Sequence, residues 1–406
     1  MKNNWPTKKL GEVCEFLNGL WTGKEPPYIK VGVIRNTNFT KDGTLDDSNI
    51  AYLNVEKKQF EKRKLICGDV ILEKSGGGPK QPVGRVIIFN KDKGSFSFSN
   101  FTSVIRIKDP KELNFNFLHR FLFFSYISGI TEKMQSHSTG IRNLDSKLYK
   151  NIDIPLPSLH EQHHIVKILD EVFAKVAKAK EDVEKNLQNS KALFESYLQS
   201  VFTNPRKDWD EKKLGEVCNF VRGPFGGSLR KSIFKKEGYV VYEQQHAIYN
   251  QFSKVRYFID ENKFNEMKRF ELRSGDLIMS CSGTMGKIAI APVGIKKGII
   301  NQALLKLSPN KDLINVFLKN WMESAVFQND LKKYTKGAAI KNVVSVKILK
   351  GIKIYIPKLA EQKLIISKLD ALSAETKKLE AIYNQKLANL EELKKSVLKK
   401  AFAGEL

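Results

Sequence analysis

The spacing of apolar residues between Leu159 and about Phe202 constrains the fold more than any other feature of this sequence. Apolar residues recur there at alternating steps of four and three, which keeps one seam on one side of a helix for many turns. The same register returns 200 positions later (369 − 169). The seam positions are Ile165, Leu169, Val172, Val176, Ala179, Val183, Asn186, Ser190, Leu193 and Tyr197, then Ile365, Leu369, Leu372, Thr376, Leu379, Tyr383, Lys386, Leu390, Leu393 and Val397. Because such a seam needs a partner in water, the two helices are predicted to pair as an antiparallel coiled coil.

Polar residues interrupt this seam at Asn186, Lys386 and Thr376. Polar layers in a coiled coil can set the register of its helices. The alternative is that these positions are partly exposed, and the sequence leaves both interpretations open. At ~1.5 Å per residue the first helix is roughly 65 Å long, about two turns of B-DNA at ~34 Å each.

The remainder of the chain also repeats, in the same order in both halves. The matched pairs are Trp5 with Trp209, 8–14 with 212–218, 68–72 with 275–279, 75–76 with 282–283, 84–88 with 286–290, 117–118 with 317–318, 140–143 with 337 and 340–342, 154–157 with 354–357, and 161–162 with 361–362. Short β-branched and aromatic runs, such as 28–34, 69–73, 85–89 and 101–107, predict strands in the first copy. We therefore expect an α+β chain with two β-rich domains related by a pseudo-twofold axis and separated by the two long helices.

The expected boundaries follow from the repeat and from helix-capping signals. The first β-rich domain covers residues 1–157, the first helix 158–203, the second domain 204–357 and the second helix 358–406. Ser158 and Glu161 form a capping-box pattern at the start of the first helix. Lys358 occupies the equivalent position before the second helix, which predicts a weaker start there.

Charge points to a polyanionic partner. The formal net charge is +25 and the pI is about 9.6, which favours nucleic acid, then an anionic membrane, then an acidic protein. Residues 1–10 lack the apolar core of a signal peptide, and the apolar run 117–130 is interrupted by His119 and Arg120. The four cysteines form no Cys-x-x-Cys pair, so neither a zinc ribbon nor a disulfide framework is expected. The chain is predicted to be a cytoplasmic, polyanion-binding protein.

Loops in which the two copies differ supply the candidate DNA-binding residues. Arg and Lys suit guanine, whereas Asn and Gln suit adenine. The candidates are Arg35, Asn36, Asn38, Lys80, Gln81 and Arg85 in the first copy, and Arg222, Arg230, Gln244, Gln245, His246 and Lys287 in the second. For each of them the alternative is an ordinary solvated surface residue.

Three motifs suggest chemistry but fail on inspection. Residues 160–164 spell His-Glu-x-x-His, yet the repeat keeps only Glu361 and Gln362, so a helix start is favoured over a metal site. Residues 25–28 resemble the Asn/Asp-Pro-Pro-Tyr loop of amino-methyltransferases, but Glu25 stands in the first position, so a turn entering a strand is the better interpretation.

The third motif, residues 282–287, lacks the flanking residues of a phosphate-binding P-loop. It remains either a Gly-rich turn close to a DNA phosphate or a plain hairpin turn, and residues 75–81 carry the same two interpretations. No metal ligand and no catalytic residue is therefore assigned.

With its repeats aligned, the sequence resembles the specificity subunit of type I restriction–modification enzymes. The resemblance rests on Trp5 with residues 8–13, the Gly-Asp strand starts, the 282–288 turn, the Ile-x-Ile-Pro junction into Glu361-Gln362, and the ending 401–406. It implies two target-recognition domains, each binding one half of a bipartite asymmetric DNA site. It also implies helices that set the gap and dock two modification subunits.

The same resemblance assigns all catalysis to partner subunits. The modification subunits would methylate adenine with S-adenosylmethionine, and ATP-driven restriction subunits would join them, so this chain would need no cofactor. One alternative is a non-catalytic basic coiled-coil scaffold that binds nucleic acid or acidic protein without sequence specificity. Another is a stand-alone zinc hydrolase or methyltransferase.

Overall fold

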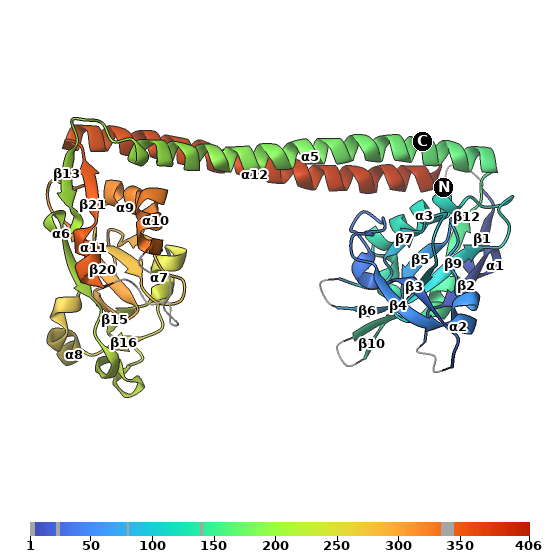
Figure 1. Cartoon of the computed structure of the whole chain (residues 1–406), viewed down its shortest axis with the longest axis horizontal. Helices are drawn as coiled ribbons and strands as arrows, with labels where there is room; N and C mark the ends of the chain where they lie inside the picture. Colours follow the sequence, from blue (N-terminus) through green and yellow to red (C-terminus); the bar gives the residue numbers. More distant parts are fainter. Residues whose placement is uncertain (1–4, 22–24, 79–80, 139–140, 334–344) are drawn as a thin grey trace. The chain divides into compact units, whose positions relative to one another are not determined.

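The computed structural model describes residues 5–21, 25–78, 81–138, 141–333 and 345–406, which fold as two compact units (Figure 1). Unit 1 comprises residues 1–184 and 385–406, and unit 2 comprises residues 185–384. Both long helices, α5 (Leu159–Thr203) and α12 (Leu359–Ala403), contribute to both units. Each unit therefore contains one β-rich domain and part of each helix, which confirms the α+β class. Within the described residues, no helix is long and apolar enough to cross a membrane.

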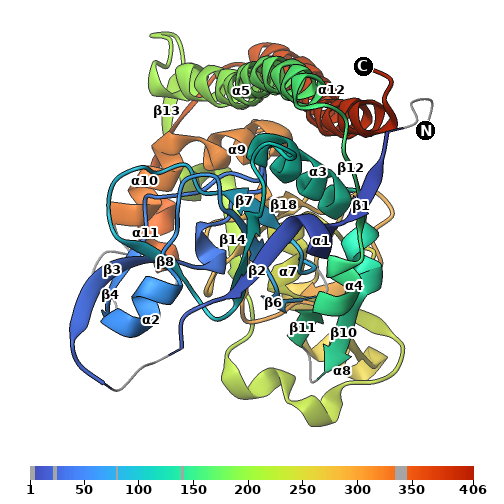
Figure 2. The ribbon, with the colours of Figure 1, turned by 90° about the vertical axis from the view of Figure 1, so that its right-hand side faces the viewer.

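Unit 1 is built on four small sheets. Its strands are, sheet by sheet and in spatial order, β1 (Thr7–Lys9) with β12 (Asp153–Pro155); β2 (Cys14–Asn18), β9 (Thr102–Ile107), β5 (Val70–Glu73) and β7 (Val86–Ile88); β4 (Ala51–Glu56), β3 (Tyr28–Ile34) and β8 (Phe96–Phe98); and β10 (Gln135–Ser138), β11 (Ile141–Leu144) and β6 (Ser75–Gly77). Only β3 and β8 pair in parallel among these strands. The short helices are α1 (Leu10–Val13), α2 (Lys57–Lys62), α3 (Phe115–Ile127) and α4 (Ser146–Lys150). In both views the β10–β11–β6 sheet lies on the side of unit 1 away from the long helices (Figures 1 and 2).

Among its described residues, unit 2 repeats the strand order of three of these four sheets and shows no counterpart of β10–β11–β6. Its strands are β13 (Asp210–Lys213) with β21 (Lys353–Ile356); β14 (Cys218–Arg222), β20 (Leu304–Pro309), β17 (Leu277–Ser280) and β18 (Ile288–Ile290); and β16 (Phe258–Ile259), β15 (Tyr239–Tyr242) and β19 (Gly298–Ile300). Its helices are α6 (Leu214–Val217), α7 (Gln244–Tyr249), α8 (Glu261–Glu266), α9 (Asn315–Glu323), α10 (Ala325–Lys333) and α11 (Val346–Gly351). The two β-rich domains therefore share one fold. The predicted match of 140–143 with 337 and 340–342 lies in part outside the described residues.

The predicted strands of the first copy are confirmed. The run 28–34 is β3, and the runs 69–73, 85–89 and 101–107 contain β5, β7 and β9. These runs form strands because β-branched residues suit a pleated surface and because positive-φ glycines such as Gly68 end the preceding turn. The matched residues 117–118 and 317–318 lie in α3 and α9.

Each domain core includes residues from the start of one long helix and from the end of the other. In unit 1, Ile165 and Leu169 of α5 are buried with Leu398 and Phe402 of α12. The ring of Phe402 lies 5.3 Å from that of Phe121 and packs edge-on. In unit 2 the equivalent residues from the opposite helix ends, such as Phe202 and Ile365, join the core. Within each unit, the start of one helix therefore lies beside the end of the other, as an antiparallel pair requires.

The seam follows the predicted register only in part. Ile165, Leu169, Val176, Ile365 and Leu369 are buried. Ser190 and Thr376 are buried as well. The half-buried predicted positions are Val172, Ala179, Val183, Tyr197, Leu372, Leu379, Tyr383, Leu390 and Val397.

Leu193 and Leu393 were predicted for the seam and are exposed by 55% and 47%. Phe194 and Lys394 take their places in the buried stripe. A helix with 3.6 residues per turn rotates away from a strict 3.5-residue pattern by about 20° per heptad. From Val183 to Phe194 the stripe advances by four, three and four residues (183, 187, 190, 194), which is one more step of four than the predicted register contains. For the same reason Asn186 and Lys386 are exposed and do not form a buried polar layer.

Lys394 shows how a charged residue is accommodated in this stripe. Its side chain is buried, its ammonium pairs with Asp42, and it lies 5.3 Å from the ring centroid of Phe173. Burial raises the pKa of the Asp42 carboxyl, but the hydrogen bond and charge of Lys394 together with the charge of Lys180 outweigh burial, so that the pKa lies below its usual value. This contact joins the domain of unit 1 to the end of α12.

One buried glutamine fixes the start of each long helix. Gln162 donates to the carbonyls of Glu112 and Pro157 at 2.9 Å and accepts from the backbone N–H of Asn114 at 2.8 Å. Gln362 makes the equivalent three bonds in unit 2. Both helices begin at equivalent residues, Leu159 and Leu359, although only the first has a serine cap. The glutamine clamp explains why the missing cap at Lys358 does not move the start of α12.

Acidification is expected to destabilise unit 1 through His119. Burial, helped by the charge of Arg120, lowers the pKa of His119 to about 3. An unfolded histidine titrates near ~6.5, so between these values the unfolded chain binds more protons. Stability is therefore complete above about pH 6.5 and falls by up to about 1.4 kcal/mol per pH unit as the pH drops towards 3. Chemical denaturation of the full chain at pH 7 and pH 5, with and without His119→Phe, measures this contribution. Equal pH dependence in both chains would contradict it, and the exposed His164 (His164→Phe) serves as the control.

Candidate nucleic-acid interface

Arg85, a candidate base reader, is committed to a buried ion pair. Its Nε lies 2.7 Å and its Nη2 2.9 Å from the two carboxylate oxygens of Glu73, whose side chain is almost fully buried. The same guanidinium donates to the carbonyls of Asn36 and Phe39. With its donors used in this way, Arg85 holds three segments of unit 1 together. In this conformation its guanidinium is committed to partners within unit 1, and base reading by Arg85 stays a prediction.

Asn38 and His246 are also internal rather than exposed. Asn38 is buried, donates to the carbonyls of Asp46 and Asn49, and accepts from the N–H of Arg35. His246 is fully buried, and its ring nitrogens lie 2.9 Å from the backbone of Glu243 and 3.0 Å from the carbonyl of Lys254. Because both side chains satisfy backbone groups of the turns that follow β3 and β15, they shape these loops and are not available to DNA.

The other candidates of the first copy differ in how their side chains are placed. Asn36 donates to the carbonyl of Ser75 at 2.8 Å, while its Oδ1 is buried without a hydrogen-bond partner. Arg35 is half-buried, its Nε also lacks a partner, and it lines a cavity of about 270 Å³. Gln81 is exposed, and Lys80 lies outside the described residues. Arg35 and Asn36 therefore each keep one buried polar atom without a partner, and the amide of Gln81 faces the guanidinium of Arg85.

The candidates of the second copy gather around the turn between β17 and β18. Arg222 is half-buried and its guanidinium contacts the thiol of Cys281. Gln244 is half-buried beside Gly283, and Lys287 is exposed at the end of the turn.

Two further candidates differ from this group. Gln245 donates to Glu243, which also pairs with Arg256, and Arg230 is exposed on the loop after β14. The structure thus brings Arg222, Gln244 and Lys287 to one place and leaves Arg230 apart.

Of the two Gly-rich segments, one forms a turn and the other begins as a strand. Gly283 and Gly286 have φ values of 59° and 74°, and Ser280 exchanges backbone hydrogen bonds with Gly286 and Lys287. This geometry is a hairpin turn between β17 and β18, in agreement with one of the two predicted interpretations. Residues 75–77 are strand β6.

Metal and thiol chemistry have little support in the described part of the chain. Within it, no group of three or more His, Cys, Asp or Glu side chains could hold a metal ion. Burial raises the pKa of Cys14, Cys218 and Cys281 to about 12, so these thiols stay protonated at neutral pH. His163 of the His-Glu-x-x-His pattern bonds the side chain of Asn114.

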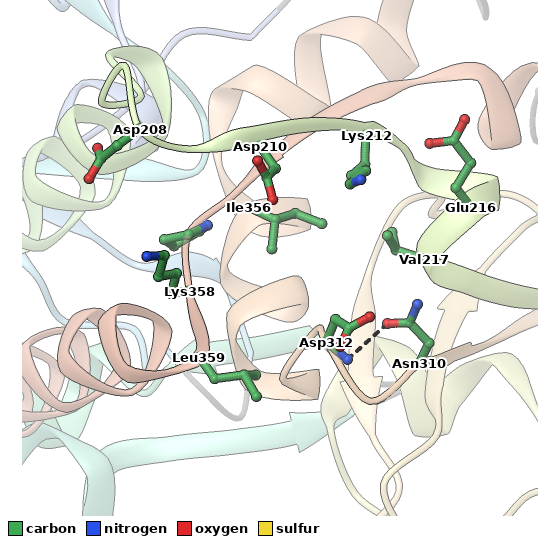
Figure 3. Close-up of a pocket in the computed structure, with 11 residues that line it drawn as sticks. Asp208, Asp210, Lys212, Glu216, Val217, Asn310, Asp312, Ile356, Lys358 and Leu359 are labelled. Carbon is green, nitrogen blue, oxygen red and sulfur yellow. Dashed lines mark hydrogen bonds between the residues drawn. The ribbon is translucent and has the colours of Figure 1, made fainter.

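A larger cavity in unit 2, about 580 Å³, lies between β13, β21 and the start of α12 (Figure 3). Asp208, Asp210, Glu216 and Asp312 line it together with Lys212 and Lys358. Four carboxylates against two ammonium groups repel a phosphate backbone. The cavity is therefore a poor site for DNA, despite its size.

Sequence reasoning missed two exposed aromatic residues at equivalent positions. Trp21 and Phe225 are 66% and 83% exposed. The 204-residue offset that pairs Trp5 with Trp209 continues without a gap to this pair, so the repeat itself carried the signal.

Comparison with known proteins agrees with this duplicated architecture. The family described as "Type I restriction modification DNA specificity domain" matches residues 2–187 and again 206–391. The EcoBI specificity subunit of Escherichia coli is 26% identical over 309 residues, which cover 69% of this chain and 64% of that protein. The EcoKI specificity subunit of Escherichia coli K12 is 24% identical over 449 residues, covering 100% of this chain and 90% of that protein. The MjaVIII specificity subunit of Methanocaldococcus jannaschii is 28% identical over 295 residues, covering 68% and 67%.

Solved structures share the fold. A chain from work described as "Structural basis underlying complex assembly and conformational transition of the type I R-M system" aligns with a TM-score of 0.77 and 22% identity, over 99% of this chain and 98% of that chain. The HsdS subunit from Thermoanaerobacter tengcongensis aligns with a TM-score of 0.63 and 20% identity, over 100% of this chain and 98% of that chain. With two matched domains that together cover most of its length, this chain belongs to the type I restriction modification DNA specificity domain family.

Proposed function

We propose that this chain is the DNA-recognition subunit of a type I restriction–modification complex. Each β-rich domain reads one half of a bipartite asymmetric site. The observation that carries the proposal is one fold present twice with different side chains at equivalent positions. Arg85 and Glu73 in unit 1, for example, correspond to Lys287 and Ser280 in unit 2. Two domains of one fold that carry different side chains suit a DNA site whose two halves differ in sequence.

We propose that the recognition domains are residues 1–157 and 204–357, and that residues 158–203 and 358–406 form the spacer helices. We assign base and phosphate contacts to the candidates, other than Arg85, whose side chains are half-buried or exposed. These are Arg35, Asn36 and Gln81 in unit 1, and Arg222, Arg230, Gln244, Gln245 and Lys287 in unit 2. The net charge of +25 supports a strong and salt-dependent contribution from phosphates.

The chain acts as a non-catalytic subunit in this proposal. The helices set the gap between the half-sites and dock two modification subunits, which supply adenine methylation with S-adenosylmethionine. ATP-dependent restriction subunits complete the complex, and its DNA target implies a cytoplasmic location. Family membership favours this function over a basic scaffold without sequence specificity.

The methylation pattern of a genome tests the proposal. When the chain is co-expressed with a modification subunit, methylated adenines are expected in one split motif with two defined halves and a fixed gap. Single-molecule sequencing measures this pattern directly. Methylation scattered over unrelated sequences would favour the unspecific scaffold. Methyl transfer by the purified chain alone would favour a stand-alone enzyme.

Shortening both helices tests the spacer role. Removal of seven residues from the middle of α5 and of the equivalent seven from α12 shortens each helix by about 10 Å, or about three base pairs at ~3.4 Å each. The expected motif keeps both half-sites and loses about three base pairs from its gap. A deletion in one helix alone is the control, since it breaks the pairing of the seam and should abolish methylation. An altered half-site after the paired deletion would contradict the spacer role.

A further inference from the structure

Each unit carries an exposed aromatic residue on a rigid support at the far end of its first long strand. Strand β2 begins at Cys14, in the core that contains Ile165 and Phe402, and leads away from the long helices to Asn18. Strand β14 does the same from Cys218 to Arg222 in unit 2. Three residues after each strand stand Trp21 and Phe225, both largely exposed. Single exposed apolar side chains are common on protein surfaces, but these two recur at equivalent positions of the two copies.

The support of each aromatic residue is a glycine that admits no side chain. A Cβ on Gly19 would lie 1.8 Å from the carbonyl oxygen of Ser99, and a Cβ on Gly223 would lie 1.8 Å from that of Asn301. Arg63 adds hydrogen bonds to the carbonyls of Asn18 and Gly19 at 3.0 and 3.1 Å. Backbone hydrogen bonds from Leu20 to Phe98 and from Gly223 to Leu304, both 2.9 Å, hold the chain just before each ring, so less entropy is lost when the ring binds.

An amide side chain accompanies each aromatic residue. Asn100 and Gln302 follow β8 and β19 at equivalent positions, because Thr102 and Leu304 close the same turn onto Ser99 and Asn301. Both amides are exposed. Gly19 approaches the backbone of Asn100, and Gly223 approaches that of Gln302, so each amide lies next to its aromatic loop. The chain thus presents the same pair of side-chain types twice, from loops far apart in sequence.

In unit 1 the pair borders a cavity suited to a flat, polar ring. The 270 Å³ cavity is lined by Trp21 and Asn100, by the apolar Leu20 and Val33, and by Arg35. The Nε of Arg35 and the hydroxyl of Ser99 are buried there without hydrogen-bond partners. A nucleobase offers a π-face to the indole and edge groups to such donors and acceptors.

We infer that Trp21 with Asn100, and Phe225 with Gln302, are base-contacting pairs, one for each half-site. The aromatic ring stacks on a base or wedges into a base step, and the amide reads an adjacent edge, for which adenine is the best partner. Protein partners would also accept an exposed ring. DNA is favoured because the pair recurs in both domains of a chain with a charge of +25 and includes an amide. The inference rests on the proposed function and extends it to residues outside the candidate set.

Methylation mapping with the complete complex tests the pairs. Trp21→Ala is expected to weaken methylation at the motif at least tenfold and to relax one half-site, as the loss of one stacked base would do. Phe225→Ala should relax the other half-site. Trp21→Phe and Phe225→Tyr keep a ring and should retain most of the methylation activity. Complexes with Asn100→Ala or Gln302→Ala should also methylate DNA sites in which an adenine of the corresponding half-site is replaced by another base.

Exposed apolar residues at another pair of equivalent positions provide matched controls. Leu148→Ala in α4 and Ile348→Ala in α11 remove similar exposed surface and should leave the motif unchanged. Binding of a duplex with 2-aminopurine in either half should give a fluorescence rise that the corresponding alanine variant loses. The inference is overturned if Trp21→Ala and Phe225→Ala both keep wild-type sequence selectivity, or if both affect the same half-site. It is also overturned if the modification subunit no longer binds either variant. If the wild-type complex itself shows no split motif, the proposed function fails instead.

Discussion

Replacement of Arg85 by alanine is expected to destabilise unit 1 by about 3–5 kcal/mol, because it leaves the buried carboxylate of Glu73 without its counterion. The carbonyls of Asn36 and Phe39 lose donors at the same time. For a unit of this size about 1 kcal/mol corresponds to roughly 2–4 °C, so the melting temperature of the full chain should fall by roughly 10 °C. Differential scanning calorimetry of the full chain measures this shift.

A double variant separates the buried charge from lost packing. Arg85→Met combined with Glu73→Leu replaces the pair by apolar side chains and should recover most of the stability. Arg230→Ala, which removes an exposed guanidinium, should change stability by less than about 0.5 kcal/mol. If Arg85→Ala left the melting temperature unchanged and weakened DNA binding alone, Arg85 would return to the set of base readers.

The fold could be predicted to the extent that it depends on periodicity and on the repeat. Alternating steps of four and three identified both long helices, and the ordered matches required two domains of one fold. The register failed at Leu193 and Leu393, because the pattern was extended at 3.5 residues per turn while the helices keep a period nearer 3.6. Burial of Lys394 could not be foreseen, since it depends on Asp42, a residue more than 350 positions away.

The candidate site was less predictable because residue type does not reveal hydrogen-bond partners. Arg85, Asn38 and His246 belong to the types that read bases, yet folding commits each to internal partners. Those partners are buried carboxylates and backbone carbonyls, which carry no sequence pattern. The missed pair Trp21 and Phe225 differs in this respect: its signal, a shared offset from the start of each copy, was present in the sequence.

Replacement of Gln162 or Gln362 by alanine is expected to cost about 3 kcal/mol or more in the unit concerned. Each amide is fully buried and satisfies three backbone groups, for Gln362 the N–H of Ile314 and the carbonyls of Asp312 and Pro357. A buried backbone group left without a partner costs about 1–3 kcal/mol. Hydrogen exchange on the full chain should show faster exchange around residues 112–117 for Gln162→Ala and around residues 312–317 for Gln362→Ala.

The adjacent exposed residue provides the control for this clamp. Lys363→Ala changes the same helical turn but removes no buried partner, and it should alter stability by less than about 0.5 kcal/mol. The glutamine also gives the repeated Glu-Gln pair a structural reason that needs no metal, because it joins each domain to the first turn of its helix. If Gln162→Ala and Gln362→Ala left exchange unchanged in both segments, the helix starts would be held by other contacts, and the weaker cap at Lys358 should then become the more sensitive end.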